Sequence, residues 1–388
     1  MKNEKIYLDN AATTKPKDKV VDCIVNGLKN NWYNPSSLYT EGRNISDIIT
    51  KAKKHIAYFI GARSEEIYFT SGGSESNSWA VQGFVHYWTA KGYKPVVITS
   101  TIEHKSIMAC VENLCVETHF VGVDVYGNIS CEQIEELLKN ISHDTTKKVL
   151  VSIQHANNEI GTIQDIKKLS SIVHKYSAFF HTDGVQTIGH IPVNVNKIGI
   201  DMLSASAHKF GGLKGSGFLY IRNCVEIKPL IYGSQNSGMR GGTENVDSIV
   251  SMAIALQFCN VSKDHVNSLY DIKNKFTKAF LELPYCIQIN NHDNEYLNTL
   301  PTIISVTIKE RVTAEALVYL LNSSGICISS GSACNSHNEE PSYVLKAIGL
   351  SDEDAVRTIR ISFDDTLNFE QINRFIAELD KAIKILIS

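Results

Sequence analysis

One lysine stands where covalent chemistry is feasible. Residues 201–217 run from a short apolar segment through small residues to His208 and Lys209, and glycines follow directly. The pattern predicts a strand that ends in a loop where backbone can approach a ligand closely. An amine that forms a Schiff base must be uncharged part of the time, which requires a shielded site. Taken alone, a solvent-exposed loop lysine is the better interpretation, so the assignment depends on the rest of the chain.

A thiol is the second candidate. Small and polar residues flank Cys334 throughout residues 329–342, and no apolar pattern predicts its burial. The segment is typical of an exposed loop, where a thiolate can attack a substrate and then carry a covalently bound group. An unremarkable surface thiol is the alternative, although exposed thiols are usually avoided in a reducing cell.

Polar side chains follow several strand-like runs. Asp183 ends an apolar run, where an unpaired carboxylate is costly; a protonated ring nitrogen would stabilise it, and a turn or helix cap is the common alternative. Asn158 and Gln186 can donate hydrogen bonds to a ring oxygen or serve as turn residues. His104 can lie over a ring and move protons, or be an ordinary loop histidine.

Two further groups suit anionic ligands. Residues 71–77 follow a strand-like run and open a helix, so Gly73 and Ser74 can receive a phosphate at the helix N-terminus. A serine cap with a glycine turn explains the same residues equally well. Arg360 lies on a predicted strand and is a candidate for a two-point grip on a carboxylate, with a salt bridge at the strand edge as the alternative.

The elements that position these groups form a repeating pattern. From about residue 67 to 219, short β-branched or aromatic runs alternate with helical stretches, which predicts an α/β fold with a mostly parallel sheet. Open sheets of this kind bind ligands at the carboxyl edge of their strands. We therefore expect seven side chains to converge there: Ser74, His104, Asn158, Asp183, Gln186, His208 and Lys209.

The chain length predicts more than one domain. At 388 residues it exceeds one core of roughly 150 residues. A long amphipathic helix over residues 263–283 bridges to a second α+β unit. That unit has predicted strands at 302–308, 326–329 and 358–363 and helices at 313–321 and 368–386. We expect a large domain over residues 12–260 and a small domain over 261–388, with residues 1–11 packing against the small one.

Composition excludes several classes of protein. The net charge of −3 and the pI near 6.5 argue against a large nucleic-acid or membrane-binding face. The first residues lack a signal-peptide core, and no stretch approaches the ~18 apolar residues of a membrane span. The nine cysteines include no C-x-x-C pair, which excludes the common zinc and disulfide layouts. We expect a cytoplasmic protein without a metal site.

Taken together, these motifs resemble the cysteine desulfurases, pyridoxal-phosphate enzymes of the class V aminotransferase type. The resemblance runs nearly end to end, and the order of the motifs is highly specific. It rests on ten stretches: Tyr7–Thr14, Asn34–Ser37, Thr70–Ser76, Glu103–His104, Asn157–Gly161, Asp183–Gln186, Ser206–Lys209, Arg240–Thr243, Ser330–Cys334 and Ile359–Ser362.

The resemblance implies a role for each matching residue. Lys209 would be the Schiff-base lysine, Asp183 would contact the pyridine nitrogen and Gln186 the ring oxygen, with His104 stacked on the ring beside Asn158. The substrate carboxylate would be held by Asn34 and Arg360, and Cys334 would be the nucleophile. The cofactor phosphate would be held by Gly73, Ser74, Ser206, His208 and, from a second subunit, Thr243.

The implied fold is that of the large class of pyridoxal-phosphate transferases known as fold type I, assembled as a homodimer. Three stretches depart from the usual family pattern. The turn after the lysine carries Leu213 in place of proline, the partner-facing loop reads Arg240-Gly-Gly-Thr243 in place of Arg-Ser-Gly-Thr, and residues 335–338 replace a common Thr-Ser-Ala. We expect these departures to affect the acceptor more than the chemistry.

The expected activity is conversion of L-cysteine to L-alanine, with sulfur passed to Cys334 as a persulfide and then to an acceptor protein docking near that loop. Iron–sulfur assembly, tRNA thiolation and DNA sulfur modification remain open as destinations, without direct nucleic-acid or membrane binding. Selenocysteine lysis and transamination are alternatives, although transamination needs no thiol. A catalytically silent adaptor on the same fold ranks below these.

Overall fold

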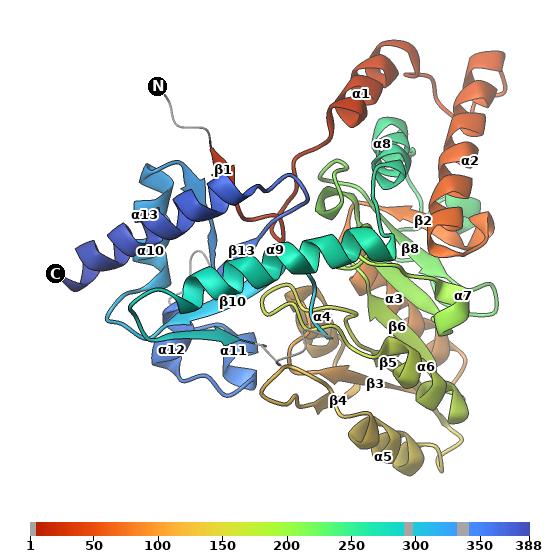
Figure 1. Ribbon diagram of the computed structural model, residues 1–388. Helices are drawn as coiled ribbons and strands as arrows, with labels where there is room; N and C mark the ends of the chain where they lie inside the picture. Colours follow the sequence, from red (N-terminus) through yellow and green to blue (C-terminus); the bar gives the residue numbers. More distant parts are fainter. Residues whose placement is uncertain (1–4, 291–297, 332–340) are drawn as a thin grey trace.

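The computed structural model describes residues 5–290, 298–331 and 341–388. The strands in these ranges form a seven-stranded sheet, a four-stranded sheet and a two-stranded pair. Figure 1 shows the seven-stranded sheet in the right half of the molecule and the four-stranded sheet in the left half. The predicted α/β class, with a larger and a smaller sheet, is confirmed.

The large sheet is built from seven short strands: β2 (Ile67–Thr70), β3 (Lys94–Ser100), β4 (Glu117–Val121), β5 (Lys147–Ser152), β6 (Phe179–Asp183), β7 (Met202–Ser206) and β8 (Gly217–Ile221). Their order is β2-β8-β7-β6-β5-β3-β4. All neighbours are parallel except that β8 is antiparallel to both β2 and β7. Because two antiparallel pairings restore the direction, β2 ends at the same edge as β7. Six strands therefore deliver their carboxyl ends to one edge.

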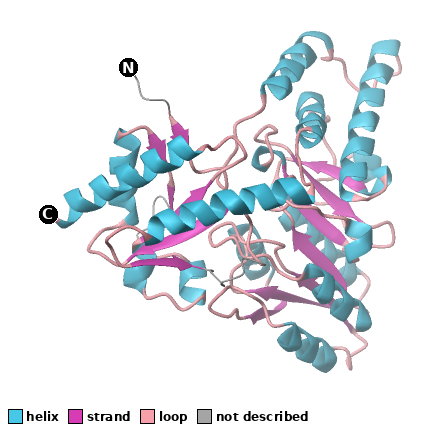
Figure 2. Cartoon of the chain, viewed as in Figure 1, coloured by secondary structure: helices cyan, strands magenta, loops and turns pink. Residues whose placement is uncertain are grey.

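Eight helices accompany this sheet in the described ranges: α1 (Asp18–Asn30), α2 (Thr40–Ile60), α3 (Gly73–Ala90), α4 (Lys105–Leu114), α5 (Cys131–Ile141), α6 (Ile166–Lys175), α7 (Val195–Ile198) and α8 (Val246–Gln257). Figure 2 shows helices on both faces of the strands. Alternate residues of a strand face opposite sides, so Val149 and Val151 belong to one apolar core and Leu150 to the other. Burial on both faces explains the continuous β-branched runs.

The smaller sheet has the order β12-β13-β10-β9 and is antiparallel. Its strands are β9 (Ile287–Asn290), β10 (Ile303–Ile308), β12 (Ser329–Ser330) and β13 (Thr358–Ser362). The helices of this half are α9 (Lys263–Leu281), α10 (Ala314–Ser323), α11 (Tyr343–Ala347), α12 (Asp352–Val356) and α13 (Phe369–Ile387). In Figure 1, α9 runs from the large sheet to the small one, as the bridging helix was predicted to do.

The single strand predicted over residues 326–329 is wrong. The structure has β11 (Ile326–Cys327) pairing with β1 (Ile6–Tyr7), and then β12 pairing with β13. The chain changes sheets at Ile328, because its hydrogen-bond partners before and after that residue come from opposite ends of the sequence. Apolar periodicity alone cannot reveal such a change of partner.

Residues near the amino end belong to the core of the smaller half. Ile6 and Leu8 are buried in the apolar cluster that also contains Phe276 and Ile361. The packing of the whole segment 1–11 against the small domain stays a prediction, since only residues 5–11 of it are described. The boundary between residues 260 and 261 stays a prediction. Within the described ranges, none of the helices has the length and apolarity needed to cross a membrane.

Candidate active site

A cavity of about 310 Å³ lies at the carboxyl edge of the large sheet. The residues on its wall come from the segments after β2, β3, β5, β6 and β7, joined by two alanines of the amino-terminal segment and one arginine of the small sheet. Sixteen residues line it: Ala11, Ala12, Gly73, Ser74, Asn77, His104, Gln154, Ala156, Asn158, Asp183, Val185, Gln186, Ser206, His208, Lys209 and Arg360. The predicted convergence of polar residues at this edge is therefore what the structure shows.

Asp183 ends β6 and is 8% exposed. Its carboxylate accepts hydrogen bonds from Asn77 Nδ2 at 2.6 Å and from the Val185 backbone N–H at 2.9 Å. Two donors fix the orientation of the carboxylate at the cavity wall. A carboxylate held in this way suits a positively charged ring nitrogen.

Lys209 follows β7 at the end of the short 3₁₀ helix η2 (Ala207–Lys209). Its Nζ donates to the backbone carbonyls of Ala11 at 2.6 Å and Ala12 at 2.8 Å. The ammonium therefore lies at the cavity wall rather than in bulk solvent. The predicted strand-to-loop position is correct, and the amino-terminal motif supplies the residues that hold the amine in place.

His208, beside the lysine, remains neutral. Burial, together with the charges of Lys209 and Lys214, lowers its pKa to about 4. Its Nδ1 lies 3.1 Å from Thr13 Oγ1. A neutral imidazole contributes hydrogen bonding to an anionic group without competing with Lys209 for charge.

A hydrogen-bond chain links His104 to Asp183. Asn77 Nδ2 donates both to Asp183 and to Ser106 Oγ at 3.0 Å, and Ser106 Oγ lies 2.8 Å from His104 Nδ1. The Ser106 backbone N–H also donates to His104 Nδ1 at 3.1 Å. Because Nδ1 accepts that bond, a proton on the neutral ring sits on Nε2. His104 is thus held in one tautomer at the cavity wall.

Glycines shape the end of the cavity that is suited to bind a phosphate. Gly72, with φ +152°, precedes α3, and a β-carbon on Gly73 would lie 2.6 Å from Val185 Cγ2. Ser74 and Ser206 add hydroxyl groups at the same wall. The start of an α-helix with small residues around it is a ready place for an anion.

Arg360 reaches the cavity from β13 of the small sheet and is 1% exposed. Its Nη2 forms an ion pair with Asp9 Oδ1 at 2.8 Å, and its Nη1 donates to the Asn158 carbonyl at 3.0 Å. The Nε atom is buried and has no hydrogen-bond partner among the described residues. The salt bridge considered from the sequence exists, and the same guanidinium also lines the cavity.

Two predicted site residues lie elsewhere. Asn34 does not line the cavity; its Oδ1 accepts the Ser36 backbone N–H at 2.8 Å. Thr243 lines a separate cavity of about 230 Å³, whose wall also includes Thr70 and Ser71. Gln186 does line the main cavity, and its Nε2 donates to the Ala11 carbonyl at 3.1 Å. Cys334 lies outside the described residues.

Sequence reasoning missed two groups of the site, Asn77 on the cavity wall and Glu103 behind it. Asn77 lies four residues after Gly73, on the same face of α3, so helical spacing could have indicated it. Glu103 is fully buried, and burial with the charge of Asp183 raises its pKa to about 8, against the effect of bonds from Ser100 and Gln154. Its position directly before His104 was the only signal.

Comparisons with known proteins agree with this geometry. The model of the family "Aminotransferase class-V" matches residues 6–375, so the chain belongs to that family. Members of the family depend on pyridoxal 5'-phosphate. The chain is 38% identical to "Cysteine desulfurase IscS" of Methanosarcina thermophila over 99% of this chain and 93% of that protein.

Solved structures show the same likeness. A "NIFS-LIKE PROTEIN" superposes with a TM-score of 0.88 at 31% identity, covering 98% of this chain and all (100%) of the other. A structure titled "SspA in complex with cysteine" superposes with a TM-score of 0.79 at 32% identity, covering 93% and 99%. The names of these relatives support cysteine desulfurase activity.

The cavity fits pyridoxal 5'-phosphate. The donor set comprises an amine, a buried carboxylate, an imidazole and hydroxyl groups beside a glycine turn that a β-carbon would fill. Lys209 would hold the aldehyde, Asp183 the ring nitrogen, and Gly73, Ser74, Ser206 and His208 the phosphate. These assignments of individual roles stay predictions.

Proposed function

We propose that the protein is a cysteine desulfurase that uses pyridoxal 5'-phosphate to convert L-cysteine into L-alanine and a persulfide on Cys334. The observation that carries the proposal is the single cavity in which Lys209, Asp183 and His104 meet Arg360. Three of these side chains come from separate strand ends of the large sheet, and the fourth comes from the small sheet. Cysteine desulfurase relatives that cover nearly the whole chain support the same activity.

The proposed reaction balances in atoms and electrons. The Cys334 thiolate attacks the sulfur of L-cysteine, a sulfur–sulfur bond forms, and the carbon–sulfur bond of the substrate breaks. The sulfur atoms are oxidised and the former Cβ is reduced and protonated, so thiol plus L-cysteine becomes persulfide plus L-alanine. When bound, pyridoxal phosphate supplies an electron sink for the substrate carbon atoms.

Substrate binding and proton transfer would be carried out by separate residues of the chain. Arg360 would bind the substrate carboxylate, because its guanidinium is buried at the cavity wall and its Nε has no partner in the part of the chain that the structure describes. Lys209 would move the proton at the substrate Cα, and His104 would serve as a second proton carrier through Nε2. Asp183 would keep the ring nitrogen protonated.

The proposal is tested by supplying L-cysteine to the holoenzyme and to its Cys334→Ser variant. We expect the variant to lose alanine formation and the protein-bound persulfide, measured by chromatography and by intact-protein mass spectrometry. Cys115→Ser, at an exposed cysteine, is the matched control and should retain activity. Undiminished alanine formation by Cys334→Ser would remove Cys334 from the mechanism, and parallel assays with L-selenocysteine would reveal a selenium preference.

We also propose that the enzyme is a cytoplasmic homodimer that passes sulfur to a protein acceptor near the Cys334 loop. Thr243 and Asn34 do not line the cavity of their own chain. Helix α1 presents apolar residues at helical spacing, with Val21 45%, Val25 46% and Leu28 65% exposed. Capture of partners on the persulfide form, followed by mass spectrometry, would identify the acceptor.

A further inference from the structure

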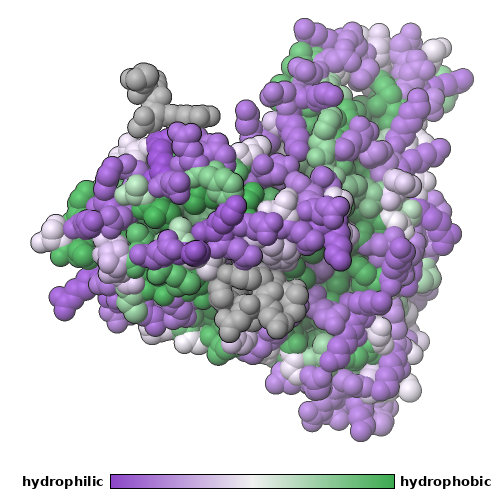
Figure 3. Space-filling model, viewed as in Figure 1, coloured by the Kyte–Doolittle hydropathy of each residue, from purple (hydrophilic) through white to green (hydrophobic). Residues whose placement is uncertain are grey.

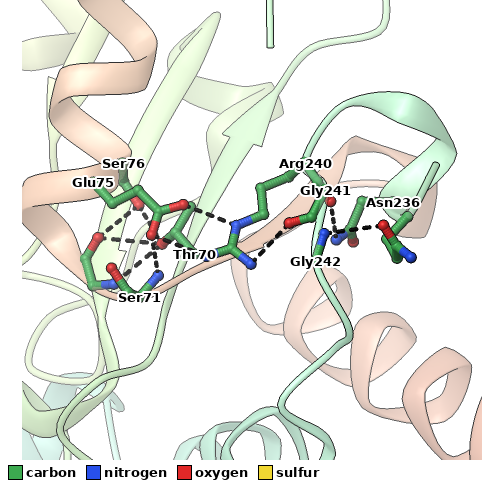
Figure 4. A network of polar contacts seen from close by, with 10 residues as sticks. Thr70, Ser71, Glu75, Ser76, Asn236, Arg240, Gly241 and Gly242 are labelled. Carbon is green, nitrogen blue, oxygen red and sulfur yellow. Dashed lines mark hydrogen bonds and ion pairs between the residues drawn. The ribbon is translucent and has the colours of Figure 1, made fainter. Parts of the chain in front are cut away.

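Two residues without a role in the proposed chemistry, Glu75 and Arg240, are joined by an ion pair. Glu75 lies in the first turn of α3, and Arg240 lies 165 residues later in the chain. Arg240 Nε donates to Glu75 Oε1 at 2.9 Å, and Nη2 donates to Oε2 at 3.3 Å. Figure 4 shows the two side chains extending toward each other from separate parts of the chain. A two-point contact of this kind fixes both position and orientation.

Glu75 holds the turn at Ser71, which precedes the end of the cavity that is suited to bind a phosphate. Glu75 Oε2 also accepts the Ser71 backbone N–H at 2.7 Å. Its side chain is 11% exposed and that of Arg240 is 22% exposed. Burial alone would raise the pKa of Glu75, but the bonds from Arg240 and Ser71 lower it. The carboxylate is therefore charged at neutral pH and screened little by solvent.

The Arg240 end belongs to a compact loop, defined here as the Thr243 loop, residues 231–243. Within it, the Gly241 N–H donates to the Ile231 carbonyl at 2.9 Å and the Gly242 N–H donates to Gln235 Oε1 at 3.0 Å. A β-carbon on Gly241 would lie 2.2 Å from the Tyr232 carbonyl oxygen. The close approach of these backbones leaves no room for a β-carbon at Gly241. Arg240 links this loop, which is held together by its own hydrogen bonds, to α3.

Resting on the proposed function, we propose that the Glu75–Arg240 pair positions the phosphate end of the cofactor site by holding the Thr243 loop against the turn at Ser71. Glu75 bonds both the turn and the loop, so its loss releases the two together. In the dimer, the same tie would connect the phosphate turn of one subunit to the loop that reaches the other. Glu75 and Arg240 are positioning residues, because neither lines the main cavity.

The test compares two ligands that differ only in the phosphate. The apoenzyme is titrated with pyridoxal 5'-phosphate and with pyridoxal, and binding is followed by visible absorbance. For Glu75→Gln and for Arg240→Lys we expect the dissociation constant for pyridoxal 5'-phosphate to rise roughly tenfold, with that for pyridoxal unchanged. The double variant should bind no more weakly than the weaker single variant, because both remove one interaction.

Glu65→Gln is the matched control, since its pair with Arg63 spans 4.0 Å with both side chains more than half exposed; its binding of both ligands should equal that of the wild type. Near-ultraviolet circular dichroism checks the fold, and Arg240→Lys keeps the charge should Glu75→Gln misfold. Wild-type affinity in both single variants, or an equal loss of both ligands, would overturn the inference. A wild-type protein that binds neither ligand would refute the proposed function, and this inference with it.

Discussion

Asp183 illustrates how one buried charge depends on neighbours from distant segments. The carboxylate is held by Asn77, and Asn77 in turn connects through Ser106 to His104. A single amide thus fixes both the proposed ring-nitrogen partner and the proposed proton carrier. Asp183 lines the cavity, whereas Glu103, whose pKa burial raises to about 8, does not.

Replacing Asp183 with Asn should lower the rate of alanine formation from L-cysteine by roughly 100-fold, because the neutral amide cannot stabilise a protonated ring nitrogen. The hydrogen bonds that Asp183 accepts can in part be kept, so the fold should persist. The measurement is kcat, with cofactor content read from absorbance. Asp271→Asn, at an exposed position on α9, should retain wild-type kcat; an equal kcat in Asp183→Asn would contradict the assignment.

Glu159 gives a prediction about pH and stability. Burial raises its pKa from the ordinary value of 4.5 to about 7, against the bond from Ser342 and the charge of Arg360. The folded state therefore holds the proton more tightly than the unfolded chain, so this group reduces stability as pH rises from about 4.5 to about 7. The free energy of unfolding of Glu159→Gln should lack that decrease, a difference of about 1–3 kcal/mol at pH 8 relative to pH 4.5.

Urea unfolding of both proteins at a series of pH values measures the difference. Glu103, whose raised pKa acts in the same direction, is present in both proteins and cancels in the comparison. Glu315→Gln, at an exposed position on α10, should follow the wild-type curve. Parallel curves for the wild type and Glu159→Gln would show that Glu159 ionises at its ordinary pKa.

At the scale of elements, the junction of β2, β7 and β8 decides where the turn at Ser71, which precedes α3, lies. Strand β8 begins at Gly217, where a β-carbon would lie 2.4 Å from the Ala205 carbonyl oxygen and 2.8 Å from Gly72 Cα. Both neighbours are backbone atoms that a side-chain rotation cannot move. The close packing of these strands therefore requires glycine at this position.

Gly217→Ala should reduce the free energy of unfolding by about 1–3 kcal/mol through overpacking. It should also weaken binding of pyridoxal 5'-phosphate, because the clash displaces Gly72 beside the phosphate turn. Chemical unfolding and cofactor titration measure the two effects. Gly122→Ala provides the control, because its added carbon would meet no described atom within 4 Å apart from those of its chain neighbours. A Gly217→Ala protein as stable as Gly122→Ala would refute the packing argument.

At the scale of the molecule, helix α1 has an apolar face that is exposed in the single chain. Besides its three apolar residues, Trp32 is 70% exposed just beyond the helix. Figure 3 shows hydrophobic residues among hydrophilic ones in this upper right part of the molecule. An exposed stripe that ends in a large aromatic ring is typical of an interface between proteins, which supports the proposed homodimer.

Leu28→Asp should therefore convert a dimer into a monomer, because a carboxylate in the apolar face would be desolvated on association. Sedimentation velocity should give twice the 43.1 kDa chain mass for the wild type and the single-chain mass for the variant. Leu281→Asp alters a leucine that is 57% exposed at the end of α9 and should leave the dimer intact. A monomeric wild type would contradict the proposal.

The sequence by itself determined the local pieces of this protein. β-branched runs followed by polar clusters predicted where strands end, and that placed Lys209, Asp183 and His104 at one edge. Those patterns depend only on residues near one another in the chain, so they can be read without coordinates. The helix that bridges the two sheets was predicted for the same reason.

Only the tertiary structure decided which distant residues meet. It joined Arg360 to Asp9, Arg240 to Glu75 and Asn77 to Asp183, and it placed Thr243 outside the cavity of its own chain. These contacts follow from the order and direction of strands, and the two antiparallel pairings of β8 are an example. The physical reason is that such pairings are selected by packing of the whole chain rather than by local preference.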